Sequence, residues 1–417
     1  MSTQITQLPQ GLTVATENVP GALSVAAGVW VGVGARDEPA ELSGASHFLE
    51  HLLFKGTADR SAKQISESVD RVGGDMNAFT TKEYTAYYCR LPRRSQAMAI
   101  ELLGDVLSRP ALRESDVDSE RKVILEELAM DDDSPDDVAH RLLLASLFPE
   151  HPLGRETAGD VETVMATTAA DIQQFHAYWY RSNNTVVAVA GDIDHDVVLG
   201  QITAAFADLG VDGVKPERIR PESSPGAISL LEDDTEQVHL TFGFRAFDRM
   251  DPDREALDVM NHILGGGMSS RLFEEIREKR GLVYSVYSGA SLYSDGGLLS
   301  IYAGARPEQA AEVAGLVRIE LDRLRIDGVT NDELDIARGY LSGSFALGLE
   351  DSGSRMARNA GLLTAMGAIR SPEEQAARWE AVSSSDVDRV IERILSQPVV
   401  VSAVGPITDE LRAVVTV

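Results

Sequence analysis

The chain has 417 residues, with 38 Lys and Arg against 66 Asp and Glu, and its formal net charge is −28. This length is enough for two or three domains that bury a core without disulfides. The single cysteine excludes a disulfide within the chain. The acidity argues against a protein that binds nucleic acid non-specifically, because such a protein needs a basic surface. It permits a cationic substrate.

The start of the chain and its apolar runs bear on location. Residues 1–10 lack the basic stretch and the apolar stretch of a secretory signal. Nowhere does an apolar run approach the ~20 residues that a membrane helix needs. We therefore expect a cytoplasmic protein that does not associate with membranes.

The predicted elements show the same order in both halves of the chain. In the first half we expect a strand within 22–34, helices at 46–55 and 65–72, strands within 77–91, helices at 95–107 and 117–130, a loop at 131–137 and a strand at 185–190. In the second half we expect a strand at 238–245, a helix at 254–264, strands within 283–303 and a helix at 307–324.

This repeated order indicates an internal duplication with an α+β fold. Each half is predicted to form a mainly antiparallel sheet packed with helices. A segment rich in Gly, Pro, Ser and charged residues separates the halves. It predicts an N-terminal domain at 1–210, a linker at 211–226 and a C-terminal domain at 227–417.

The stretch His47-Phe48-Leu49-Glu50-His51 lies in the first predicted helix. At 100° per residue, His51 lies about 40° from His47, and Glu50 lies about 60° away on the other side. The three side chains therefore share one face. Two neutral imidazoles at this spacing can bind one divalent ion, with the carboxylate beside a water molecule that the ion activates. The motif is typical of one class of zinc peptidases.

Incidental polar residues on a helix are the alternative explanation for this motif. The helix is apolar on almost every other side, which predicts that it is buried. His and Glu side chains without partners would cost several kcal/mol in such a place. This cost favours a metal site.

A catalytic zinc site needs a third protein ligand. The predicted helix 117–130 offers glutamates, and its helical phase separates them. Glu126 falls on the polar side with Lys122, whereas Glu120 and Glu127 lie at the edge of the apolar face. We predict that Glu127 is the third metal ligand and that Glu120 orients a histidine.

Together these two motifs resemble those of the pitrilysin and insulysin peptidases, the inverzincins, and most closely the branch related to mitochondrial processing peptidases. That family has a third glutamate some 76 positions after its His-x-x-Glu-His motif, in a segment like Glu-Arg-x-Val-Ile-x-Glu. Here His51 and Glu127 are 76 positions apart, and residues 120–127 read ERKVILEE. The resemblance covers nearly the whole chain. It implies one Zn²⁺ per chain, held by His47, His51 and Glu127.

The resemblance also implies residues that contact a peptide substrate. Residues 74–88 are similar to the family's edge strand, with Asn77 and Ala78 at its start. An edge strand can bind an extended peptide by strand addition, although the alternation in this segment fits a core strand equally well. Arg277 and Tyr284 resemble the family's Arg-x6-Tyr pair, which contacts substrate carbonyls and stabilises the tetrahedral intermediate.

In this family two homologous halves form a clamshell, and this chain corresponds to one half. The resemblance implies a homodimer in which Arg277 and Tyr284 act in the partner's site. The expected function is a zinc-dependent endopeptidase for unfolded peptides, with Glu50 as general base. Two alternatives stay open, a non-catalytic assembly subunit of the same fold and the catalytic half of a heterodimeric processing peptidase. Asp136 and Asp137 are expected in a solvated loop, at positions where processing relatives recognise substrate arginine.

Overall fold

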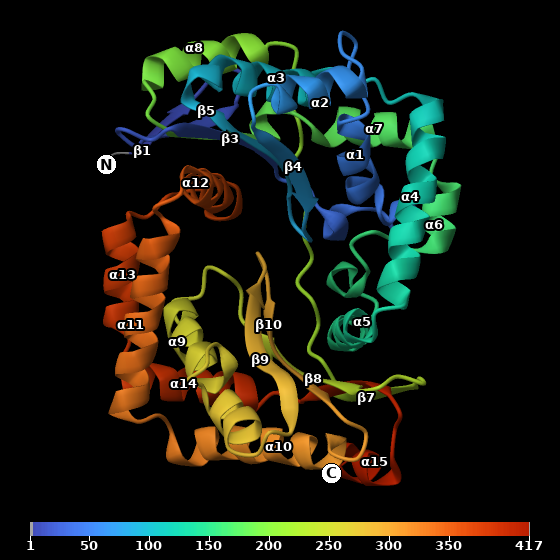
Figure 1. The fold of residues 1–417 in the computed structure, drawn as a ribbon, viewed down its shortest axis with the longest axis vertical. Helices are drawn as coiled ribbons and strands as arrows, with labels where there is room; N and C mark the ends of the chain where they lie inside the picture. The colour runs from blue at the N-terminus through green and yellow to red at the C-terminus, as the bar shows by residue number, and fades with distance from the viewer. Residues whose placement is uncertain (1–2, 417) are drawn as a thin grey trace. The chain divides into compact units, whose positions relative to one another are not determined.

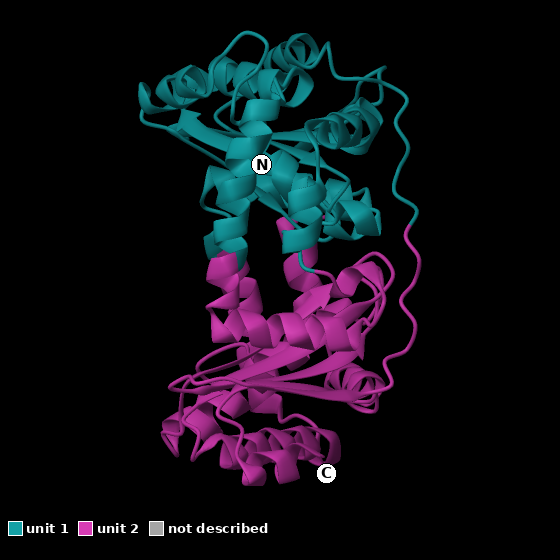
Figure 2. Ribbon diagram, turned by 90° about the vertical axis from the view of Figure 1, so that its right-hand side faces the viewer, with its two compact units in different colours: residues 1–128, 156–217, 347–369 teal, residues 129–155, 218–346, 370–417 magenta. Residues whose placement is uncertain are grey.

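A computed structural model describes residues 3–416, which form two compact units (Figures 1 and 2). Each unit combines stretches from both halves of the chain. Unit 1 comprises Met1–Leu128, Glu156–Glu217 and Leu347–Ile369, and unit 2 comprises Ala129–Arg155, Arg218–Ala346 and Arg370–Val417. One of the points at which the chain crosses from unit 1 to unit 2 lies between Glu217 and Arg218, inside the predicted linker 211–226. The prediction of continuous domains at 1–210 and 227–417 did not place 129–155 in unit 2 or 347–369 in unit 1. These are the two exchanged segments.

Unit 1 is built on a six-stranded sheet with the order β1-β2-β6-β3-β5-β4. Its strands are β1 (Thr3–Gln7), β2 (Thr13–Asn18), β3 (Ser24–Val31), β4 (Asp75–Thr80), β5 (Thr85–Pro92) and β6 (Thr185–Gly191). All neighbours pair antiparallel except β2 and β6. The predicted mainly antiparallel sheet is confirmed, and β4 lies at its edge.

Helices cover both faces of this sheet (Figure 1). The larger core holds side chains from α1 (Ala45–Leu53), α2 (Ala62–Asp70), α3 (Gln96–Ser108), α4 (Glu114–Asp132), α6 (Val161–Ala166), α7 (Ala169–Trp179) and α8 (His195–Ala205). The exchanged helix α12 (Ser352–Met366) packs against β2, β3 and β6 and forms a second core with Trp30. A Cβ at Gly28 would come within 2.5 Å of the Met356 sulfur, so this close approach requires glycine.

Unit 2 repeats the plan with a five-stranded sheet, in the order β7-β11-β8-β10-β9. Its strands are β7 (Ala227–Glu232), β8 (Val238–Ala246), β9 (Val283–Leu292), β10 (Gly297–Ala305) and β11 (Val400–Gly405). The exchanged helix α5 (Pro135–Leu147) packs against β7, β8 and β11. The remaining helices are α9 (Arg254–Gly265), α10 (Ala310–Asp327), α11 (Asn331–Gly348), α13 (Pro372–Glu380), α14 (Ser384–Leu395) and α15 (Asp409–Thr416).

The structure corrects one local prediction. Asp136 and Asp137 do not lie in a loop but form the first turn of α5, which begins at Pro135. Proline suits the first helical position because its missing N–H is not needed there, and acidic side chains stabilise a helix N-terminus. Only Asp133 and Ser134 separate α4 from α5. Among residues 3–416, no helix is both long and apolar enough to cross a membrane.

Candidate metal centre

Helix α1 presents its polar side chains on a single face. Its buried residues are apolar or small, namely Ala45, Ser46, Phe48, Leu49, Leu52 and Leu53. His47, Glu50 and His51 are partly exposed on the remaining face. The burial pattern therefore places the three polar groups of the motif together, as their spacing predicts.

A buried carboxylate holds the start of α1. Glu38 is 4% exposed and accepts the backbone N–H groups of Gly44 and Ser46 at 2.7 and 2.6 Å. Burial raises the pKa of Glu38 to about 7. Gly44 itself has a φ of 94°, and a Cβ there would come within 2.4 Å of the Ala158 carbonyl oxygen. These contacts fix where the helix begins and hence where its first histidine lies.

Helix α4 supplies two glutamates to the same region. Glu120 is buried, Glu127 is partly exposed and Glu126 faces solvent, which agrees with the helical phase of the sequence. Arg121 holds α4 against the end of α6, because its guanidinium donates to the carbonyls of Val164 and Thr167. These hydrogen bonds help to fix where α4 places Glu127.

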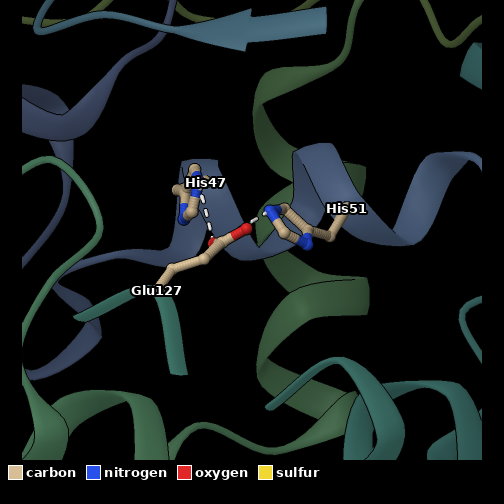
Figure 3. A group of neighbouring side chains, drawn as sticks. All are labelled: His47, His51 and Glu127. Carbon is tan, nitrogen blue, oxygen red and sulfur yellow. Dashed lines mark ion pairs between the residues drawn. The ribbon is translucent and has the colours of Figure 1, made fainter. Parts of the chain in front are cut away.

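The structure brings His47, His51 and Glu127 together (Figure 3). Oε2 of Glu127 lies 3.8 Å from Nε2 of His47 and 3.5 Å from Nε2 of His51. One ligand atom from each residue falls within 4.8 Å of the other two. In the described part of the chain, this is the one such group of His, Cys, Asp or Glu that could hold a metal ion.

These three residues fit a zinc ion. Ligand atoms about 2.0–2.2 Å from a tetrahedral metal lie roughly 3.3 Å apart, close to the separations from Glu127. Within residues 3–416, Oε2 of Glu127 is buried without a hydrogen-bond partner, although it lies between the two imidazoles. Burial lowers the pKa of His47 to about 4, so its imidazole is neutral and can donate a lone pair. Two imidazoles and a carboxylate are a donor set typical of catalytic zinc.

A second carboxylate, that of Glu120, contacts the ring nitrogen of His51 that does not face Glu127. Nδ1 of His51 lies 3.2 Å from Oε2 of Glu120, so an Nδ1–H donates to the carboxylate and leaves Nε2 free to face Glu127. Nζ of Lys55 lies 2.5 Å from the other oxygen of Glu120. Sequence analysis identified Glu120 but missed Lys55. Lys55 lies two residues beyond the end of α1 and pairs with a glutamate of another helix, so the sequence around His51 carried no direct signal for it.

Glu50 contacts the edge strand. Oγ1 of Thr80, the last residue of β4, donates a hydrogen bond to Oε2 of Glu50 at 2.5 Å. Burial raises the pKa of Glu50, and the bond from Thr80 and the proximity of His51 act in the opposite direction. Sequence analysis also missed Thr80, because nothing local relates residue 80 to residue 50.

The residues expected to contact substrate fall in both units. Asn77 and Ala78 lie on the edge strand β4, and Oδ1 of Asn77 accepts the backbone N–H of Ala78 at 2.8 Å. Arg277 and Tyr284 belong to unit 2, on a π-helical turn (Phe273–Glu278) and on β9. The Arg277 guanidinium lies 5.2 Å from the centroid of the Tyr284 ring, which is 79% exposed. The expected Arg/Tyr pair is thus adjacent, with the tyrosine open to solvent and the arginine half-buried.

Comparison with known proteins identifies the family. Residues 13–161 match the family described as insulinase (peptidase family M16), and residues 166–341 match the peptidase M16 inactive domain. A protein of Streptomyces coelicolor, named an uncharacterized zinc protease, is 43% identical over 97% of this chain and 90% of its own length. This chain belongs to peptidase family M16. The predicted membership in the pitrilysin and insulysin peptidases is confirmed.

Further relatives and solved structures of M16 proteins agree with this assignment. An uncharacterized zinc protease of Mycobacterium tuberculosis is 42% identical over 98% of this chain and 96% of its own. The crystal structure of a protease from Helicobacter pylori superposes with a TM-score of 0.92 at 24% identity, covering 97% of this chain and 99% of that one. A peptidase M16 inactive domain from Pseudomonas fluorescens gives 0.91 at 23% identity, covering 98% of each chain. These structures confirm the fold. Within residues 3–416, the His/Glu cluster lies in the stretch that matches the insulinase family.

Proposed function

We propose that this M16 chain is a zinc-dependent endopeptidase that cleaves unfolded peptides. The observation that carries the proposal is that His47, His51 and Glu127, three zinc-type ligands from two helices, lie together, while Oε2 of Glu127 has no hydrogen-bond partner in the described part of the chain. The relatives named zinc proteases support the same function. His47, His51 and Glu127 would hold one Zn²⁺, which when bound acidifies a water molecule and polarises the peptide carbonyl.

Glu50 is the proposed general base. It lies on the same face of α1 as the two histidines, and its carboxylate is held by Thr80. Its raised pKa brings the carboxylate closer to the range in which a group can both accept and return a proton near neutral pH. Glu50 would take a proton from the attacking water and pass it to the leaving amine of the substrate.

The proposed substrate site is the free edge of β4. A peptide added there would hydrogen-bond to main-chain groups, so binding would demand an extended, unfolded chain and little particular sequence. Asn77 occupies one main-chain donor of this strand, that of Ala78. A substrate that uses this donor would displace the Asn77 side chain.

We further propose that the active unit is a homodimer, in which Arg277 and Tyr284 of one subunit act in the site of the other. A guanidinium and an exposed phenol side by side can donate hydrogen bonds to a substrate carbonyl and to a developing oxyanion. This proposal rests on the family resemblance of the Arg-x6-Tyr pair.

The decisive experiment compares the wild-type chain with Glu50→Gln. Both proteins are purified, assayed for bound zinc and incubated with a mixed library of unstructured peptides whose cuts are mapped by mass spectrometry. We expect about one zinc ion per chain in both proteins and cleavage only by the wild type. Glu126→Gln, a change on the solvent side of α4, is the matched control and should cleave normally.

Three results would contradict the proposal. Cleavage by Glu50→Gln at the wild-type rate would remove Glu50 from the mechanism. A wild-type chain that binds no stoichiometric zinc and cuts no peptide would favour a non-catalytic subunit of the same fold. Zinc binding without cleavage by the chain expressed alone would favour the catalytic half of a heterodimer.

A further inference from the structure

Lys55 is connected to the proposed metal site through two contacts. It lies two residues after the end of α1, and its Nζ lies 2.5 Å from Oε1 of Glu120. The second oxygen of Glu120 lies 3.2 Å from Nδ1 of His51, whose Nε2 faces Glu127 at 3.5 Å. An amine, a carboxylate and an imidazole thus form one continuous chain that ends at a metal-facing atom.

Burial explains why Glu120 needs a cation. The Glu120 side chain is only 5% exposed, and a buried carboxylate without a partner is strongly unfavourable. In the described part of the chain, Lys55 is the one Lys or Arg that forms an ion pair with Glu120. The Lys55 side chain is 38% exposed, so it can supply its charge while part of it stays hydrated.

The geometry also divides the two oxygens of Glu120 between two partners. The bond from Lys55 to Oε1 restrains the carboxylate, so that Oε2 points at Nδ1 of His51. A carboxylate held in this way fixes both the tautomer and the ring orientation of a metal-binding histidine. Without Lys55, Glu120 would keep one contact and could rotate away from His51.

We propose that Lys55 is a positioning residue for the metal, which acts through Glu120 to hold His51 with Nε2 toward the site. This inference rests on the proposed function, because it assumes that His51 binds a metal ion. It assigns Lys55 a role that a lysine in an ordinary surface ion pair does not have.

Zinc affinity of the full chain, measured by competition with a chelating indicator, tests the inference. We expect Lys55→Met to weaken zinc binding about tenfold, as changes to partners of metal-binding histidines do. Lys55→Arg keeps the charge and should stay within about threefold of the wild type. Lys63→Met is the matched control, because Lys63 is 83% exposed and pairs with Glu67 in solvent, and it should leave zinc affinity unchanged. Lys55→Gln is measured alongside as a second variant that removes the charge.

A double-mutant comparison tests whether Lys55 acts through Glu120. Glu120→Gln should weaken zinc binding, and adding Lys55→Met to it should cause little further loss. Unchanged zinc affinity in both Lys55→Met and Lys55→Gln would overturn the inference, and so would a full second loss in the Glu120→Gln background. A wild-type chain without zinc would instead overturn the proposed function, so the two failures are distinguishable.

Discussion

Thr80 and Glu50 join the edge strand of the unit 1 sheet to the helix that carries the His-x-x-Glu-His motif. The Thr80 hydroxyl donates to Oε2 of Glu50 at 2.5 Å, across 30 residues of sequence. The same strand carries Asn77 and Ala78, where we propose that substrate binds. The proposed general base is therefore restrained by the strand that would hold its substrate.

Thr80→Val should slow turnover more than it weakens substrate binding. A hydrogen bond to a charged group contributes about 1.5–3 kcal/mol, so its loss should lower kcat at least about tenfold with little change in KM. Thr80→Ser keeps the hydroxyl and should restore most of the activity. Steady-state kinetics on a peptide found in the library experiment gives both constants. A Thr80→Val enzyme with wild-type kcat would show that Glu50 needs no such restraint.

Gly44→Ala should disturb the start of α1. The added Cβ would lie 2.4 Å from the Ala158 carbonyl oxygen, at a φ of 94° that disfavours alanine. We expect a loss of at least about 2 kcal/mol in the free energy of unfolding, together with weaker zinc binding. Gly73→Ala is the control, because Gly73 has a φ of 71° and nothing within 4 Å of the added Cβ. Its loss should be about 1 kcal/mol, and equal losses in the two variants would contradict the steric argument.

The contribution of His47 to the stability of the metal-free chain should decrease as the pH falls below neutrality. The pKa of His47 is about 4 in the folded chain, whereas an imidazole that is not buried has a pKa of 6.5. Between these values the unfolded state binds a proton that the folded state does not, so stability decreases as the pH drops through this window. Between about pH 7 and about pH 5, the contribution of this one residue is roughly 2 kcal/mol.

Urea unfolding after zinc removal measures this effect. Between about pH 7 and about pH 5, the wild-type midpoint should decrease relative to that of His47→Gln, which lacks the titrating imidazole at residue 47 but keeps the opposing titration of Glu38. Identical pH dependence in the two proteins would show that His47 is not held neutral by the fold.

Mixed dimers test whether sites are shared between subunits. Glu50→Gln and Tyr284→Phe chains should each have little activity alone. Coexpressed with different affinity tags, they should recover activity up to about a quarter of the wild type, because random pairing gives half mixed dimers with one intact site each. Mixed dimers that are isolated through both tags and show no recovery would contradict a contribution of Tyr284 in trans.

Local geometry accounts for what could be predicted about the metal centre. His47, Glu50 and His51 share a face because an α-helix turns by 100° per residue, and this is true wherever the helix packs. The phase of α4 likewise put Glu120 and Glu127 on a different side from Glu126. Lys55 lies beyond the end of α1, and its pairing with Glu120 on α4 does not follow from helical spacing.

Contacts between distant segments could not be predicted from helical spacing. Thr80 meets Glu50 only because β4 pairs with β5 and packs beside α1. Asp136 and Asp137 were expected in a loop because acidic residues beside a proline are common in both loops and helix starts. The apolar pattern of α5 predicts that one face is buried but does not say which sheet buries it.

The amino-acid sequence by itself determined part of the elements of this M16 chain, the mainly antiparallel α+β plan and the face of α1 that bears the motif, because these depend on neighbours within a few residues. Only the tertiary structure decided that α12 completes unit 1, that α5 completes unit 2, that Thr80 contacts Glu50 and that Lys55 contacts Glu120. The physical reason is that burial selects partners by shape and charge across the whole chain, and such complementarity leaves no local periodicity in the sequence.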